Sequence, residues 1–401
     1  MNSVVRQMWE QNTDVVMVDT GNSYEGLCEY VGGKYISYTD EHPITMNPFA
    51  IKREELNIEK IGFLKNLVML IWKGTQGEVT KTEDRLIEQV ITEYFDEYFM
   101  KKQIENLSFN TFYEYSAVRI PQIIKENNLA GIDLASYNYL LKDFYKGGSH
   151  ELTLNENLDT KLFDETFIVF EIDSIKDDPL LFPLVTLIIM DVFIQKMRIK
   201  KNRKVLVIEE AWKAIASPMM AEYIKYLYKT ARKFWASVGV VTQEIQDIVG
   251  SPIVKEAIIN NSDVVMLLDQ SKFRERFDEI KAILGLTDVD CKKIFTINRL
   301  ENKEGRSFFR EVFIRRGSVG GVFGVEEPHE CYMTYTTERA EKEALKLYKK
   351  ELQCDHQHAI EAYCRDWELS GITKSLPFAQ KVNQTGHVLN LKPKRKFDEY
   401  M

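Results

Sequence analysis

A short apolar run that stops at two carboxylates constrains the fold of this chain more than any other feature of its sequence. The run is Lys204-Val205-Leu206-Val207-Ile208, and Glu209-Glu210 follow it directly. Aliphatic and β-branched residues without polar alternation are typical of a strand that is buried on both faces of a parallel sheet. The sequence therefore predicts such a sheet. It also predicts that both glutamates lie at the carboxyl end of the strand, where open α/β sheets bind their ligands.

Other segments continue the alternation of strands and helices that a parallel sheet requires. Strands are predicted at 15–19, 35–38, 166–172, 237–241 and 263–268, and helices at 2–11, 24–30, 181–197 and about 219–231. These elements predict an α/β fold built on a parallel sheet.

The alternation of strands and helices stops between about 51 and 165, where apolar residues recur at helical spacing. The predicted helices are 64–72, 83–100, 112–126 and 133–144. We interpret this block as an all-α insertion that could be a lid, a partner surface or simple padding. The expected domain boundaries are 1–50 and 166–345 for the two parts of the α/β core, 51–165 for the insertion, and 346–401 for a C-terminal helix and tail.

The C-terminal third is expected to be less regular. Its pattern predicts a helix around 272–284, strands near 308–316 and 331–335, and one charged helix from about 338 to 366. Residues from about 372 onward mix polar and apolar types with little period, so we expect them to pack loosely or to form a tail.

Composition excludes several classes of protein. A formal net charge of −8 argues against an all-over nucleic-acid-binding surface. The longest apolar stretch, 180–194, is interrupted by Pro183 and Asp191 and is shorter than the roughly 20 residues that span a bilayer. The first residues show no pattern of a secretory leader, and five scattered cysteines do not indicate a disulfide framework. We therefore expect a reduced, cytoplasmic compartment.

The glutamate pair indicates nucleotide hydrolysis. In P-loop NTPases the first acidic residue after this strand orders Mg²⁺, and the second polarises the water that attacks the γ-phosphate. Glu209 and Glu210 have that spacing, although Asp is the commoner first residue. A simpler interpretation is that both glutamates begin a helix, where they suit its dipole. The phosphate-gripping loop, G-x-x-x-x-G-K-[ST], occurs nowhere in the 401 residues.

Three further segments hold candidate residues. Arg232 and Lys233 end a helix, where a cation can cap the last carbonyls; alternatively, Arg232 is an arginine finger for a neighbouring subunit's γ-phosphate. Gln243 stands just past a strand, where its amide can contact both the γ-phosphate and the attacking water. Asp19, followed by Gly21, also ends a strand, where it could contact Mg²⁺ or phosphate or form a plain turn.

Two basic segments leave contact with nucleic acid or an anionic membrane surface open. Lys196, Arg198, Lys200, Lys201, Arg203 and Lys204 form the first segment, and Lys392, Lys394, Arg395 and Lys396 form the second. The simpler interpretation is a solvated helix end and a C-terminal tail.

Several motifs together resemble a known family. They are Val18-Asp19-Thr20-Gly21-Asn22-Ser23-Tyr24, Asn47-Pro48-Phe49, Phe170-Glu171-Ile172-Asp173, Ile208-Glu209-Glu210-Ala211-Trp212-Lys213, Thr230-Ala231-Arg232-Lys233, Val241-Thr242-Gln243-Glu244 and Leu267-Leu268-Asp269-Gln270. In this order they resemble the TraG-type conjugation ATPases of conjugative transposons, which belong with the ATPases of type IV secretion systems. The resemblance runs from residue 1 to about 345.

The resemblance implies a RecA-like core that binds ATP and Mg²⁺. It implies that Glu209 and Glu210 form the Walker B pair with Glu209 at the metal, that Arg232 and Lys233 form the arginine-finger motif, and that Gln243 senses the γ-phosphate. In that family the phosphate loop immediately precedes a helix similar to residues 2–11. The chain therefore resembles a C-terminal ATPase domain that begins just after its Walker A motif, and we expect it to be nearly inactive alone.

The resemblance also implies partners and a location. The full-length family protein is expected to form a homo-hexamer and to bind other subunits of the conjugation apparatus, at the cytoplasmic face of the inner membrane. It would energise pilus assembly or the export of DNA and protein. Two alternatives remain open: a DNA-translocating, helicase-like motor, and a nucleotide-free interaction module of the secretion apparatus.

Overall fold

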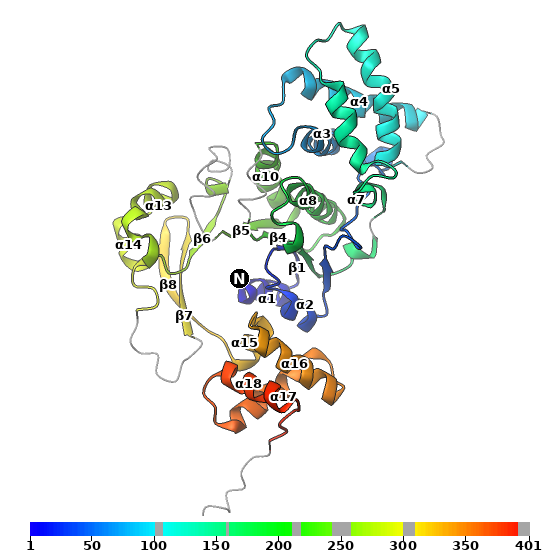
Figure 1. Ribbon diagram of the computed structural model, residues 1–401. Helices are drawn as coiled ribbons and strands as arrows, with labels where there is room; N and C mark the ends of the chain where they lie inside the picture. Colours follow the sequence, from blue (N-terminus) through cyan, green and yellow to red (C-terminus); the bar gives the residue numbers. More distant parts are fainter. Residues whose placement is uncertain (101–106, 158–159, 211–217, 243–257, 300–308, 392–401) are drawn as a thin grey trace, which may run out of the picture. The chain divides into compact units, whose positions relative to one another are not determined.

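The computed structural model describes residues 1–100, 107–157, 160–210, 218–242, 258–299 and 309–391 (Figure 1). The chain divides into two compact units. The larger unit comprises Asn12–Gly21 and Tyr35–Asn261, and the smaller comprises Met1–Gln11, Asn22–Lys34 and Ser262–Met401.

A five-stranded sheet forms the centre of the larger unit. Parallel pairs join β1 (Thr13–Asp19) to β3 (Phe167–Glu171) and to β4 (Arg203–Ile208), and join β4 to β5 (Ala236–Val240). With β2 (Lys34–Ser37) the order is β2-β3-β1-β4-β5. Every residue of β1 and β3 is buried, which explains their largely apolar sequences, because a strand covered on both faces has no solvent side. The predicted parallel sheet is confirmed.

The register of the sheet brings the carboxyl ends of its strands to one edge. Asp19 of β1 lies opposite Glu171 of β3, Val18 lies opposite Ile208 of β4, and Ile208 lies opposite Val240 of β5. The segments that follow β1, β3, β4 and β5 therefore leave the sheet at the same side, here called the carboxyl edge. These strands begin at the opposite side, here called the amino edge.

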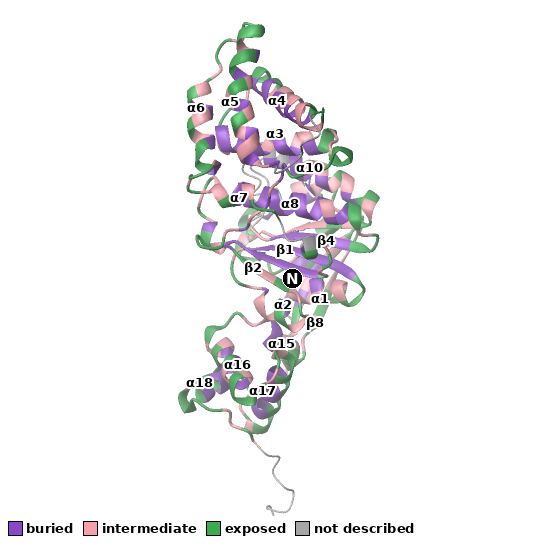
Figure 2. Cartoon of the chain, turned by 90° about the vertical axis from the view of Figure 1, so that its right-hand side faces the viewer, coloured by how far each residue is buried: buried purple, intermediate pink, exposed green. Residues whose placement is uncertain are grey.

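Helices cover the sheet and extend into a layer beyond it (Figure 2). α8 (Leu181–Ile199) packs on β1 and β4 and is buried along most of its length. α3 (Ile58–Lys73) and α10 (Pro218–Ala231) contact α8, and the outer helices follow as α4 (Lys81–Met100), α5 (Phe109–Glu126), α6 (Leu134–Leu141) and α7 (Glu151–Asn155). The helices predicted between 64 and 144 are confirmed.

Aromatic packing connects the loop after β2 to this helical layer. The ring of Phe49, fully buried, stacks on Phe112 of α5 with 4.7 Å between centroids, and on Phe95 of α4 with 6.3 Å. Phe49 therefore anchors its loop between two helices, as aromatic pairs favour offset stacking at such distances.

Two buried lysines connect α8 to its surroundings. Lys60 of α3 donates to Asp191 at 2.8 Å, and Lys196 lies 2.9 Å from Asp14 of β1. Both pairs are almost fully buried, which is tolerated because each charge has a counter-charge and further hydrogen bonds.

The smaller unit contains a three-stranded antiparallel sheet and helices. The strands are β6 (Val264–Leu267), β7 (Phe309–Arg316) and β8 (Val319–Glu326), in the order β6-β7-β8, with α13 (Phe277–Leu284) and α14 (Asp288–Ile294) in the same unit. α14 packs against β8, where Gly320 allows the ring of Phe313 to approach: an added Cβ would lie 2.5 Å from it.

The smaller unit also contains a separate helical core, formed by α15 (His329–Tyr335), α16 (Arg339–Leu352), α17 (His356–Ser370) and α18 (Ser375–Thr385). Trp367, Tyr363 and Phe378 are buried together at its centre. The helices α1 (Asn2–Glu10) and α2 (Glu25–Tyr30) belong to the same unit. Among the described residues, no helix of either unit is both long and apolar enough to cross a bilayer.

The C-terminal predictions were wrong in three places. The strand predicted at 331–335 is helix α15, which follows Pro328, a residue suited to a helix start because it lacks an amide hydrogen. The charged helix predicted at 338–366 is two helices, because Gln353 is left-handed (φ 48°) and Asp355 caps α17. The end of the chain does not pack loosely up to residue 391, since α18 contributes the fully buried Phe378.

Candidate functional site at the carboxyl edge of the sheet

Acidic residues from neighbouring strands gather at the carboxyl edge. Asp19 and Glu171 are aligned in the β1–β3 ladder and are 1% and 8% exposed. Glu209 and Glu210 leave β4 next to β1, and the amide of Glu209 donates to the carbonyl of Val18 at 3.0 Å. The parallel register thus brings carboxylates together that are far apart in the sequence.

The two buried carboxylates also organise the turns that leave the sheet. Oδ1 of Asp19 accepts a hydrogen bond from the amide of Gly21 at 3.2 Å. Glu171 accepts from the amide of Asp173 at 2.7 Å and from the hydroxyl of Tyr35 at 3.3 Å. The hydrogen bond between Asp19 and Gly21 supports the interpretation that these residues form a plain turn. Oδ1 of Asp19 is therefore already a hydrogen-bond acceptor within the turn.

Glu210 adopts an unusual backbone conformation. Its φ is +48°, a left-handed value that is costly for residues other than glycine because Cβ crowds the following carbonyl. Such conformations concentrate at functional sites, where the surrounding structure enforces them. The conformation turns the chain sharply after Glu209, directly before residues 211–217, which lie outside the described residues.

The structure places the other candidates at different positions. Gln243 lies outside the described residues, but the amide of Val241 donates to the carbonyl of Ile208 at 2.9 Å, so the chain leading to Gln243 is at the carboxyl edge. Arg232 and Lys233 are exposed in a 3₁₀ turn (Arg232–Phe234) that precedes β5, at the amino edge. They are separated from the carboxylates by the length of β5, about 13 Å at 3.3 Å per residue.

Most of the basic segment that ends α8 is neutralised. Lys196 pairs with Asp14, Arg198 with Glu59, and Lys200 with Asp164. Lys204 is 1% exposed and donates to main-chain carbonyls, and its burial lowers its pKa. These four cations therefore already have partners within the chain. The second basic segment, Lys392 to Lys396, lies outside the described residues.

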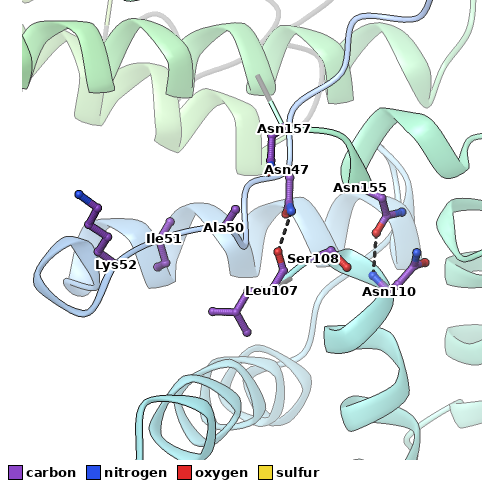
Figure 3. Close-up of a pocket in the computed structure, with 9 residues that line it drawn as sticks. All are labelled: Asn47, Ala50, Ile51, Lys52, Leu107, Ser108, Asn110, Asn155 and Asn157. Atoms are coloured by element: carbon purple, nitrogen blue, oxygen red, sulfur yellow. Dashed lines mark hydrogen bonds between the residues drawn. The ribbon is translucent and has the colours of Figure 1, made fainter. Parts of the chain in front are cut away.

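A polar cavity of about 380 Å³ lies in the helical layer rather than at the carboxyl edge (Figure 3). Two of its asparagine side chains are already hydrogen-bonded: Asn47 donates to the carbonyl of Leu107 at 2.7 Å, and Asn155 accepts from the amide of Asn110 at 2.8 Å. We assign no ligand to this cavity.

Carboxylate oxygens are the ligands that Mg²⁺ prefers, and Asp19, Glu209 and Glu210 stand at adjoining strand ends. Among the described residues, however, no three carboxylate, histidine or cysteine side chains lie close enough together to hold a metal ion. Glu171 was not among the candidate residues predicted from the sequence. Its position at a strand end, like that of Asp19, is the signal that identifies it.

The fold is that of RecA-like P-loop NTPases. VirB4 of Thermoanaerobacter pseudethanolicus superposes with a TM-score of 0.59 at 19% identity, over 82% of this chain and 85% of that one. The bacterial conjugative coupling protein TrwBdeltaN70 superposes with a TM-score of 0.52 at 12% identity, over 82% and 80%. TrwB has also been solved with ADP and Mg²⁺, with a TM-score of 0.51 at 12% identity, over 81% and 80%.

The family follows from the sequence match. The model of the TraG P-loop domain matches residues 1–367, and the chain belongs to this family. Protein TraC of Escherichia coli (strain K12) is 22% identical over 287 residues, which are 69% of this chain and 31% of TraC. The chain thus spans about a third of the length of that relative. The resemblance to conjugation ATPases predicted from the motifs is confirmed.

Proposed function

We propose that this chain is the ATPase core of a conjugative-transfer motor, which uses ATP hydrolysis to energise pilus assembly or the export of DNA and protein. The observation that carries the proposal is the Glu209–Glu210 pair at the end of β4, next to Asp19 at the end of β1. Membership of the TraG P-loop family supports it.

Each candidate residue has a role in this proposal. Glu209, with Asp19 beside it, would hold Mg²⁺, and Glu210 would accept the proton of the attacking water. Gln243 would orient that water and contact the γ-phosphate, and Gly21 would let the backbone approach the nucleotide. Mg²⁺, when bound, would offset the charge of the phosphates.

Arg232 and Lys233 would act on a neighbouring subunit. They precede β5, whereas the carboxylates follow β1, β3 and β4, so the sheet of one chain holds them at opposite edges. A guanidinium that enters a neighbour's site makes turnover depend on assembly. We therefore include a homo-hexamer in the proposal. It works with other subunits of the type IV secretion apparatus at the cytoplasmic face of the inner membrane.

The test compares two forms of the protein. Because the 401 residues contain no G-x-x-x-x-G-K-[ST], backbone amides of a phosphate loop are not available to hold the nucleotide. We expect negligible ATP turnover from this chain. We expect robust turnover from the same chain extended at its N-terminus by a segment that carries the motif. An extended chain whose motif lysine is replaced by alanine is the control.

Two results would contradict the proposal in different ways. Equal turnover by the short and extended chains would show that the carboxyl edge has been misinterpreted. No turnover by either form, together with retained binding to secretion partners, would favour the nucleotide-free interaction module.

A further inference from the structure

The strand β8 forms one edge of the three-stranded sheet of the smaller unit (Figure 1). Its pairing with β7 runs without interruption from Phe309 opposite Glu326 to Arg316 opposite Val319. On its other side, no strand of the described residues pairs with it. β8 has eight residues, whereas β6 at the opposite edge has four. A long edge strand presents a row of main-chain groups that can pair with another chain.

A lysine shows which main-chain groups of β8 point outward. Nζ of Lys293, on α14, donates to the carbonyl of Gly320 at 2.7 Å, so this carbonyl points away from β7. In an antiparallel strand, the main-chain groups of alternate residues point to the same side. The N–H and C=O groups of Val322 and Gly324 therefore also point outward. Among the described residues, these groups have no hydrogen-bond partner.

β8 lacks the features that normally protect an edge strand from pairing. Natural edges carry a proline, a charged residue within the strand, or a bulge. The sequence of β8 has no proline and no charge before Glu326, and its register on β7 has no bulge. Two of its apolar side chains are also exposed, Val319 by 75% and Phe323 by 54%. This combination indicates an edge that is kept open for pairing.

The edge is rigid before any partner arrives. A Cβ added at Gly324 would lie 2.4 Å from the ring of Phe309, and one added at Gly320 would lie 2.5 Å from the ring of Phe313. Both rings therefore pack directly on the backbone of β8. Because they hold the strand in place from one face of the sheet, pairing with a further strand loses less conformational entropy.

The two ends of β8 differ in charge. Lys293 and Arg316 are exposed at the hairpin end, and in the described part of the chain neither forms an ion pair. Glu326 and Glu327 stand at the other end. Opposite charges on neighbouring strands stabilise pairing, and like charges oppose it. An incoming strand is therefore favoured when it places a carboxylate beside Lys293 and a cation beside Glu327.

A second copy of this chain fits the edge less well than another protein does. The β8 strands of two copies could pair only through a two-fold contact, in which each copy uses the same surface. A homo-hexameric ring is instead closed by head-to-tail contacts between different surfaces. This choice of occupant rests on the proposed assembly.

We propose that the outer edge of β8, from Val322 to Glu326, is a docking site for an extended segment of a partner protein, which adds to the sheet as a further strand. The segment has no proline, alternates apolar and polar residues, and carries a carboxylate at the end beside Lys293 and a cation at the other. Main-chain hydrogen bonds supply the affinity, and side chains next to Phe323 supply selectivity.

The experiment measures the binding of short peptides to the full chain. The probe is a pool of capped seven-residue peptides in which Val, Ile, Tyr or Phe alternates with Thr between one acidic and one basic end residue, in both orders. We expect fluorescence anisotropy to identify members that bind with a dissociation constant of about 100 µM or lower. N-methylation of the amides that face β8 should weaken binding about 10-fold or more. N-methylation of the alternate amides is the matched control and should change binding little.

Variants of the chain test the same edge from the other side. Val322→Pro removes an outward amide but no hydrogen bond to β7, so the fold should persist while peptide binding falls about 10-fold or more. Met266→Ser changes an exposed residue of β6, at the far edge, and should leave binding unchanged. Lys293→Glu should weaken binding about fivefold. Replacing the acidic end residue of the peptide by lysine should restore binding to this variant and weaken binding to the wild type.

Several outcomes would overturn the proposal. They are a pool with no member that binds below about 1 mM, equal effects of N-methylation at either set of amides, and wild-type affinity in the Val322→Pro chain. Self-association of the chain in sedimentation velocity that Val322→Pro abolishes would assign the edge to a second copy instead. No measurement uses nucleotide, so a failure of the proposed ATPase activity would not affect the interpretation.

Discussion

At the scale of single residues, backbone conformation distinguishes the two glutamates more than their chemistry does. Glu209 is still hydrogen-bonded to β1 through its amide, whereas Glu210 is already in a left-handed turn. The backbone of Glu209 is therefore fixed by the sheet, whereas the backbone of Glu210 belongs to the turn. A division between a metal ligand and a base fits this difference.

Glu210→Gln should separate binding from turnover in a chain that carries the phosphate loop. An amide cannot accept the proton of the attacking water, so we expect turnover to fall by about 10²–10⁴. ATP affinity should stay close to that of the parent chain. Hydrolysis and nucleotide binding measured on the same preparation give both values. Glu156→Gln, an exposed glutamate in the helical layer, serves as the control. Unchanged turnover in the Glu210 variant would remove Glu210 from the role of base.

The buried pair Lys196–Asp14 should matter far more to stability than the neighbouring exposed pair. Lys196 is 0% exposed, and its replacement by Met would leave Asp14 buried, with Asn202 as its remaining side-chain partner within the described part of the chain. We expect a loss of about 3 kcal/mol in the free energy of unfolding. Lys200→Met removes a partner of Asp164, which is 77% exposed, and should cost less than about 1 kcal/mol. Urea denaturation of both variants checks the contrast, and equal losses would contradict it.

At the scale of elements, the strands were predictable where burial on both faces leaves no choice of residue. The segments predicted at 15–19, 166–172 and 204–208 correspond to β1, β3 and β4, because a doubly covered strand must be apolar along its length. β8 was not foreseen. Its glycines, such as Gly320 and Gly324, are uncommon in strands, so the sequence pattern does not indicate one. The structure explains them, because the rings of Phe313 and Phe309 lie where a side chain at these positions would be.

The placement of the candidate residues was predictable to the same extent. Asp19 ends one parallel strand and Glu209 and Glu210 follow another, so their position at one edge follows from the alternation of elements. The left-handed turn at Glu210 was not predictable, because it depends on how the chain leaves the sheet. Nor does the sequence show that Lys204 connects the loop before β4 to the turn before β5. The residue type alone does not reveal whether a lysine is buried or exposed.

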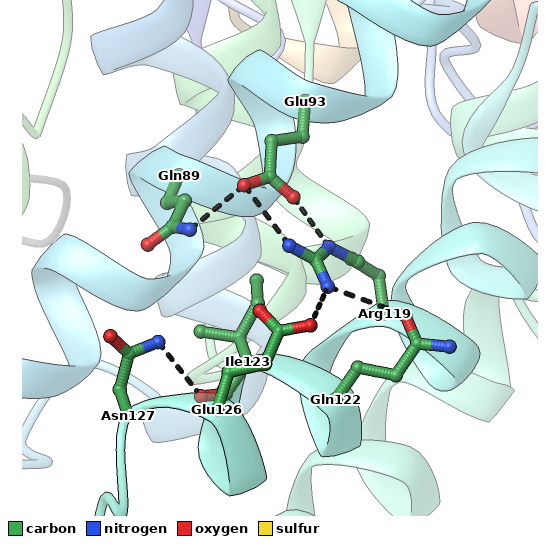
Figure 4. Close-up of polar contacts among 7 residues, drawn as sticks. All are labelled: Gln89, Glu93, Arg119, Gln122, Ile123, Glu126 and Asn127. Atoms are coloured by element: carbon green, nitrogen blue, oxygen red, sulfur yellow. Dashed lines mark hydrogen bonds and ion pairs between the residues drawn. The ribbon is translucent and has the colours of Figure 1, made fainter.

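The contact between α4 and α5 should weaken in acid. Arg119 donates to Glu93 at 2.6 Å, with Glu126 and Gln89 completing the network (Figure 4). The hydrogen bond from Arg119 holds the pKa of Glu93 below its usual 4.5. The stabilisation is therefore complete above the unfolded-state pKa of Glu93 and is lost as the pH falls through its lower folded-state pKa.

Arg119→Met tests this dependence. We expect it to lower the free energy of unfolding by about 1 kcal/mol at pH 7, because the network is only partly exposed. The difference from the wild type should shrink as the pH falls below about 4.5. Urea denaturation at several pH values measures it. Arg85→Met, which removes a pair with Glu88 whose arginine is 75% exposed, is the matched control and should change little at any pH. A constant difference for Arg119→Met would mean that packing rather than charge explains the loss.

At the scale of the whole molecule, hydrophobic packing is divided between separate cores. One core extends from the sheet through α8 into the helical layer, and another lies among α15, α16, α17 and α18. Two-state unfolding is an approximation that chains with separate cores violate. The sequence could not reveal this division, because the apolar residues of α17 and α18 have the same spacing whether they pack on each other or on the sheet.

Calorimetry should therefore resolve two transitions, and core substitutions should move one at a time. Phe378→Ala opens a cavity in the C-terminal helical core, and Phe95→Ala opens one in the helical layer of the larger unit; both side chains are fully buried. Each should cost about 3–5 kcal/mol. We expect Phe378→Ala to lower only one melting temperature and Phe95→Ala to lower only the other. The exposed Tyr139→Ser should lower neither. A single transition that both phenylalanine variants shift equally would show that the cores unfold as one cooperative body, because energy removed from either would then be lost to both.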